Sequence, residues 1–170
     1  MTLGILYAIH GNLPALEAVL DEANRQGIER WLLGGDYGAT SPWPCETLER
    51  LRALPNATWI RGNGERWLYD PPDEPPEVKE TYDRLSGALP EADRRWLFEL
   101  PERAELDGAL YVHGSPRHGE PNAAWAVWRE DGSFELRRTD YDTKTAAAAF
   151  RALGGRFGEF SAHRIETGSD

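Results

Sequence analysis

The stretch Leu6-Tyr7-Ala8-Ile9-His10-Gly11-Asn12 decides the fold, because an apolar run stops there at a polar turn. The apolar run from Leu3 to Tyr7 is too short for a helix and predicts a buried strand. Asn12 and the proline that follows shortly after it suit the start of a helix. His10 therefore follows the C-terminal end of a strand, where open α/β sheets place ligand-binding groups. Taken alone, a histidine in such a loop is more often a turn residue than a ligand.

The composition predicts one domain, residues 1–170, with a core of ordinary size. The net charge of −10, from 29 acidic and 19 basic residues, argues against binding to nucleic acid or to anionic membranes. Cys45 is the single cysteine, which excludes an internal disulfide framework and fits a reducing compartment. Since neither a transmembrane segment nor a signal peptide is found, we expect a cytoplasmic protein without a membrane partner.

Two further strands end in polar turns. Residues 29–33 predict a strand that ends at Gly34-Gly35-Asp36, and residues 57–60 predict a third that ends at Arg61-Gly62-Asn63-Gly64-Glu65. The helices predicted between them make strand–helix–strand units, which imply parallel strands with right-handed crossovers. The polar turns therefore gather at one edge of the sheet.

The second half of the chain predicts helices and hairpins. Dipeptides of the Asp-Gly type mark hairpin turns at 107–108 and 131–132. The first hairpin runs directly into His113, a fourth polar group at a strand end. The remaining elements expected are helices at 78–89, 91–100 and 143–153 and strands at 123–129 and 133–140. After Gly154-Gly155 we expect one aromatic cluster, Phe157 and Phe160, and then a polar tail.

The strand ends thus carry His10, Asp36, Asn63 and His113. Imidazole, carboxylate and amide groups together suit Mn, Fe, Ni or Zn. A carboxylate at the point where strands converge can bridge two cations, and two cations ~3.5–4 Å apart can clamp a phosphate and activate water.

At this point the sequence resembles the calcineurin-like metallophosphoesterase family, specifically its small bacterial and archaeal phosphodiesterase branch. That family carries the motifs D-x-H, G-D, G-N-H-(D/E), H-G and G-H-T-H in this order. The first four correspond here to residues 9–20, Gly35-Asp36, Gly62-Asn63-Gly64-Glu65 and 112–117. The resemblance implies a four-layer α/β/β/α sandwich of two mixed sheets with helices outside and the site at the strand ends.

Three departures from the family motifs affect the site. Ala8 stands where the family has the first aspartate, and Gly64 stands where it has a histidine. The G-H-T-H segment is absent, so we expect a truncated second sheet and a reduced metal site. His118 is a candidate substitute ligand, although an exposed loop position explains it more simply.

The resemblance implies a role for each retained residue. Asp36, Asn63 and His113 are the expected catalytic residues. Asp36 would bridge, His10 would hold the first metal, and Asn63 with His113 would hold the second. We therefore expect one divalent ion (Mn, Fe, Ni or Zn) rather than two, with a metal-free protein as the alternative.

Four neighbouring residues complete the expected site. Arg61 and Arg66 could contact phosphate oxygens, although such arginines often pair with local acids. Asn12 could line the site, and helix capping explains it equally well. Glu65 could orient a histidine from outside the site.

The resulting hypothesis is a metal-dependent phosphoesterase, a phosphodiesterase or phosphatase, that hydrolyses a small phosphate ester by metal-activated water. The alternative is a non-catalytic relative that binds a phosphate-bearing ligand or a protein partner. Because the missing segment leaves sheet edges uncovered, we also expect a homodimer that covers them.

Overall fold

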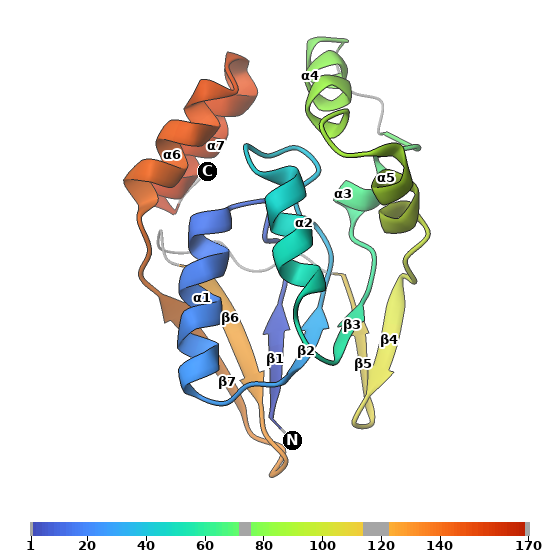
Figure 1. Ribbon diagram of the computed structural model, residues 1–170, viewed down its shortest axis with the longest axis vertical. Coiled ribbons are helices and arrows are strands. Elements are labelled where there is room, and N and C mark those ends of the chain that lie inside the picture. The colour runs from blue at the N-terminus through green and yellow to red at the C-terminus, as the bar shows by residue number, and fades with distance from the viewer. Residues whose placement is uncertain (1, 72–75, 114–122, 169–170) are drawn as a thin grey trace.

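The computed structural model describes residues 2–71, 76–113 and 123–168, and it shows helices and a hairpin arranged around a mixed sheet (Figure 1). The strands are β1 (Leu3–Leu6), β2 (Arg30–Leu33), β3 (Ala57–Trp59), β4 (Arg103–Leu106), β5 (Ala109–Val112), β6 (Ala123–Trp128) and β7 (Phe134–Thr139). The helices are α1 (Leu13–Arg25), α2 (Pro44–Arg52), α3 (Asn63–Arg66), α4 (Pro76–Ser86), α5 (Glu91–Phe98), α6 (Thr143–Ala152) and α7 (Gly155–Thr167).

The main sheet has five strands in the order β3-β2-β1-β6-β7. β1, β2 and β3 are parallel, as the strand–helix–strand units predict, and β6 and β7 are antiparallel to their neighbours. The parallel strands therefore end at one edge of the sheet, and the loops that follow them lie side by side.

Each face of the sheet packs against a different layer. Leu6, Trp31 and Leu33 belong to the larger core, together with buried residues of α1 and α2 such as Leu20 and Leu51. The alternate strand residues point to the opposite face, as the pleat of a strand requires, and join the smaller cluster that contacts the hairpin β4–β5.

The predicted fold class is confirmed, with a difference in the second sheet. Among the residues that the structure describes, that sheet consists of β4 and β5, which are antiparallel rather than mixed. Tyr111 and Leu106 pack toward the main sheet. Leu110 and Val112 on the outward face are 58% and 52% exposed, where the four-layer prediction placed helices.

The segment after Gly154-Gly155, for which we expected an aromatic cluster and a polar tail without a helix, is helical. α7 begins at Gly155 and packs on α6 through a small apolar cluster that contains Ala147, Phe150 and Ala162. Gly158 allows this contact, since a Cβ there would lie 2.7 Å from the Phe150 carbonyl oxygen. Two glycines inside the segment hide its helical character from a propensity-based prediction. His118 lies outside the described residues.

No helix in the described part of the chain is long and apolar enough to cross a membrane. The single-domain organisation stays a prediction.

Candidate active site

The site is built from the loops that follow β1, β2 and β3. The first two loops are joined by backbone hydrogen bonds, in which Ala8 N–H donates to Gly35 O (3.1 Å) and His10 N–H donates to Asp36 O (2.8 Å). Ala8, His10 and Asp36 have φ values of 51°, 48° and 58°. This left-handed conformation is uncommon for residues other than glycine, and it persists only where surrounding contacts fix it.

Glycines allow the second and third loops to approach each other closely. A Cβ on Gly62 would lie 2.3 Å from Asp36 Oδ1, and a Cβ on Gly35 would lie 2.5 Å from the Gly62 nitrogen. Gly35 also has a φ of 96°, which disfavours any side chain. The Gly-Asp and Gly-Asn motifs are therefore steric requirements of this junction.

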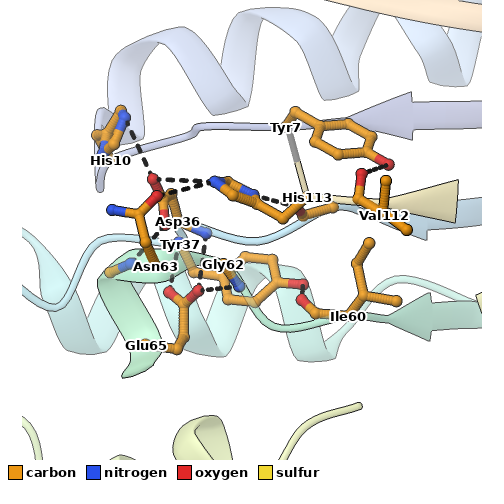
Figure 2. A network of polar contacts seen from close by, with 12 residues as sticks. Tyr7, His10, Asp36, Tyr37, Ile60, Gly62, Asn63, Glu65, Val112 and His113 are labelled. Carbon is orange, nitrogen blue, oxygen red and sulfur yellow. Dashed lines mark hydrogen bonds and ion pairs between the residues drawn. The ribbon is translucent and has the colours of Figure 1, made fainter. Parts of the chain in front are cut away.

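The structure brings together the four predicted site residues His10, Asp36, Asn63 and His113 (Figure 2). His113 Nε2 lies 3.2 Å from Asn63 Oδ1 and 3.4 Å from Asp36 Oδ2. His10 Nε2 lies 3.9 Å from the same Asp36 oxygen, and its side chain is 64% exposed. The other oxygen of Asp36, Oδ1, accepts the Gly64 N–H at 2.7 Å. One Asp36 oxygen is thus anchored to the backbone, and the other faces both histidines.

The ring of His113 is fixed from behind. Its Nδ1 lies 2.6 Å from the Gly34 carbonyl oxygen, which only accepts, so Nδ1 carries the hydrogen. The Tyr7 ring stacks on the imidazole with centroids 6.2 Å apart, and Tyr7 Oη donates to Val112 O. These contacts direct Nε2 into the site (Figure 2).

The contact between Asp36 and His113 shifts the pKa of both side chains in the metal-free protein. The hydrogen bond to Asp36 raises the pKa of His113 to about 9, against an ordinary 6.5. Burial alone would raise the pKa of Asp36, but the hydrogen bond with His113 and the charge of His10 bring it below its usual value. An imidazolium and a carboxylate therefore face each other near neutral pH.

Glu65 is fully buried and holds the backbone of two loops. Its carboxylate accepts N–H hydrogen bonds from Asp36 (2.8 Å), Tyr37 (2.8 Å) and Gly62 (2.9 Å). Burial raises the pKa of Glu65, and these three hydrogen bonds oppose that rise. Its partners in the structure are thus backbone amides, in place of the expected histidine. Through them Glu65 positions Asp36 and the Gly62–Gly64 turn.

The remaining predicted residues make local contacts. Asn12 Oδ1 accepts from Ala15 N–H, and Asn12 Nδ2 donates to Tyr141 Oη, so the alternative of helix capping describes its contacts. The Arg61 guanidinium donates to Phe98 O (2.6 Å) and to Glu102 (2.5 Å). Arg66 is exposed on α3. Substrate contact by these residues stays a prediction.

An open pocket of about 330 Å³ lies directly beside the site. It is lined by Arg61, Glu102, Arg103, Val112 and His113. It therefore places two arginines next to the His113 ring, of which Arg61 is paired with the Glu102 carboxylate.

Three tyrosines that support the site were not predicted. Besides Tyr7, Tyr37 Oη lies 2.6 Å from Leu33 O and 2.7 Å from Ile60 O, which ties the ends of β2 and β3 together. Tyr82 on α4 donates to Gly64 O. Tyr7 and Tyr37 lie next to motif residues in the sequence, and this position could have predicted their role. Tyr82 is distant from every motif in the sequence, so no such position indicates it.

Two of the distances between possible ligand atoms are compatible with a shared cation. Two donors that are each about 2.1 Å from one metal ion lie ~3.0–3.4 Å apart at octahedral or tetrahedral angles. The 3.2 and 3.4 Å separations among His113, Asn63 and Asp36 are in this range. The hydrogen bond of His113 Nδ1 to Gly34 leaves Nε2 as the ligating nitrogen. Within the described ranges, however, no group of three or more His, Cys, Asp or Glu side chains is arranged for a metal. The set is complete only with the amide oxygen of Asn63.

Parallel strands that end at a cluster of histidine, carboxylate and amide groups are typical of α/β proteins that bind ligands at the C-terminal edge of the sheet. The model of the calcineurin-like phosphoesterase family matches residues 9–152. The chain therefore belongs to the calcineurin-like phosphoesterase family. None of the curated proteins matches it.

Solved structures share the fold. A metallophosphoesterase from Sphaerobacter thermophilus is 19% identical with a TM-score of 0.79, and a hypothetical protein from Pyrococcus horikoshii OT3 is 18% identical with a TM-score of 0.79. In both cases the match covers 99% of this chain and 99% of the other chain. A putative diadenosine tetraphosphatase is 18% identical with a TM-score of 0.52, over 86% of this chain and 69% of that one.

Proposed function

We propose that this chain hydrolyses phosphate esters with a single divalent cation held by Asp36, Asn63 and His113. The observation that carries the proposal is the convergence of their donor atoms, with His113 Nε2 3.2 Å from Asn63 Oδ1 and 3.4 Å from Asp36 Oδ2. When bound, such a cation neutralises phosphate charge and lowers the pKa of water.

The protein's own groups prepare this site. Asp36 is buried and keeps its pKa below the ordinary value, so its carboxylate is ionised at neutral pH. Glu65 fixes the backbone of Asp36, and Gly64 N–H fixes its Oδ1. His10 faces the same Asp36 oxygen from an exposed position, where it can meet a substrate phosphate as a hydrogen-bond donor. The pocket that contains Arg61 and Arg103 would take the adjoining part of the ester.

The test combines metal content with turnover. Purified protein is stripped with chelator, loaded with Mn²⁺, and assayed on bis(p-nitrophenyl) phosphate and p-nitrophenyl phosphate. We expect about one retained ion per chain and a loss of at least ~100-fold in kcat/KM for Asp36→Asn. Asp21→Asn, on the exposed side of α1, is the matched control and should retain wild-type turnover.

The alternative is a non-catalytic protein that binds a phosphate-bearing ligand. It is favoured by Ala8 and Gly64, which have no polar side chain at the positions where family members carry aspartate and histidine. Under it, the loaded protein retains no metal and shows no turnover, while inorganic phosphate still raises the unfolding temperature. That result would overturn the hydrolase proposal.

A further inference from the structure

The strand β7 is the outer strand of the main sheet and has an uncovered edge. In the order β3-β2-β1-β6-β7 it pairs with β6 alone among the strands that the structure describes (Figure 1). Its backbone groups on the other side are therefore a template for another strand. Its outward side chains include Phe134 and Leu136, which are 52% and 77% exposed.

The two faces of β7 carry different chemistry. Phe134, Leu136 and Arg138 point to the exposed face. Glu135 and Arg137 point to the opposite face, where Arg137 lies over the Trp125 ring and 3.1 Å from Glu135. The strand thus carries opposite charges on the two sides of Leu136.

We propose that two copies of this chain pair through antiparallel β7 edges, with Leu136 on the two-fold axis. A two-fold axis perpendicular to the sheet keeps both faces continuous and places residues equidistant from the axis opposite each other. With Leu136 at the centre, it meets its own copy, Glu135 meets Arg137, and Phe134 meets Arg138. Directly opposite side chains on a sheet stand ~4.5–5.5 Å apart at Cβ, so all these pairs can interact favourably.

Charge selects this register over its neighbours. Centring the pair on Glu135 places two glutamates opposite each other, and centring it on Arg137 or Arg138 places two arginines opposite each other. Like charges directly opposite destabilise a strand pair. A centre at Phe134 would overlap only the start of the strand. The occupant that fits this edge is therefore a second copy of the chain, and none of the residues involved belongs to the proposed active site.

The axis position provides a specific test by sedimentation velocity over about 1–200 µM protein, where mass action shifts the equilibrium. We expect the wild type to dimerise in this range. Leu136→Lys and Leu136→Glu should each raise the dissociation constant at least ~10-fold, because each variant meets its own charge. An equimolar mixture of the two variants should recover the dimer, because the introduced lysine faces the introduced glutamate only in mixed pairs.

Controls separate this interface from others. Because Leu136 is exposed, both variants should keep the wild-type urea midpoint when it is measured at a protein concentration at which the wild type is monomeric. Leu110→Lys, on the exposed face of the hairpin β4–β5, should leave the mass unchanged. A wild type that stays monomeric to about 200 µM would overturn the proposal. So would a Leu136→Lys protein that dimerises as tightly as the wild type, or a mixture that fails to recover.

Discussion

The contact between Asp36 and His113 makes stability depend on pH in the metal-free protein. The His113 side chain is 15% exposed, and its pKa is raised to about 9 from the ordinary 6.5. Because the folded-state pKa is the higher one, the stabilisation is fully present below pH 6.5 and is lost as pH rises through 9. The gap between the two pKa values corresponds to about 3 kcal/mol of unfolding free energy.

The assay is urea unfolding followed by tryptophan fluorescence at several pH values between about 6 and 10, with chelator present. The readout is the difference in the free energy of unfolding between the wild type and His113→Gln, because this difference cancels the effect of other groups that titrate in the same range. We expect the wild-type advantage to fall by about 1.4 kcal/mol per pH unit between the two pKa values. Adding Mn²⁺ should remove this dependence, because a cation replaces the proton. A difference that does not change with pH would refute the ion pair.

Two other predictions follow from particular residues. Glu65→Gln places an NH₂ group against a backbone N–H, so we expect it to lower the free energy of unfolding in urea by roughly 2–4 kcal/mol. The control is Glu17→Gln on the surface, which should lower the free energy of unfolding by less than about 1 kcal/mol. Ala8→Asp should raise the Mn²⁺ content from about one to about two ions per chain, because aspartate tolerates the positive φ of this position. An unchanged metal content in elemental analysis would refute the assignment of Ala8 to the lost ligand position.

The sequence predicts the site well where geometry follows from topology. His10, Asp36 and Asn63 each follow a strand, and parallel strands place their C-terminal ends at one edge, so their convergence follows from the order of elements. His113 follows β5 of the separate hairpin, and the family motif alone places it at the site. Local patterns cannot supply that contact.

Local sequence patterns do not predict contacts between backbone groups and side chains that are distant in the sequence. Glu65 stands in a motif position, which marks it as important, but its partners are N–H groups of loops that only the folded chain brings together. The sequence does not predict α7, because that helix is stabilised by packing on α6, and the glycine that permits this packing is locally typical of a helix end. In both cases tertiary contacts outweigh local preference.

Glycine at position 64 is linked to the orientation of Asp36. Gly64 N–H donates to Asp36 Oδ1 at 2.7 Å, and a Cβ at this position would lie 2.9 Å from the same oxygen. Any side chain here would therefore displace the Asp36 carboxylate. With glycine, Oδ1 stays on the backbone and Oδ2 is left for His113 and His10. The glycine that stands where the family has a histidine thus also allows the retained carboxylate to keep this orientation.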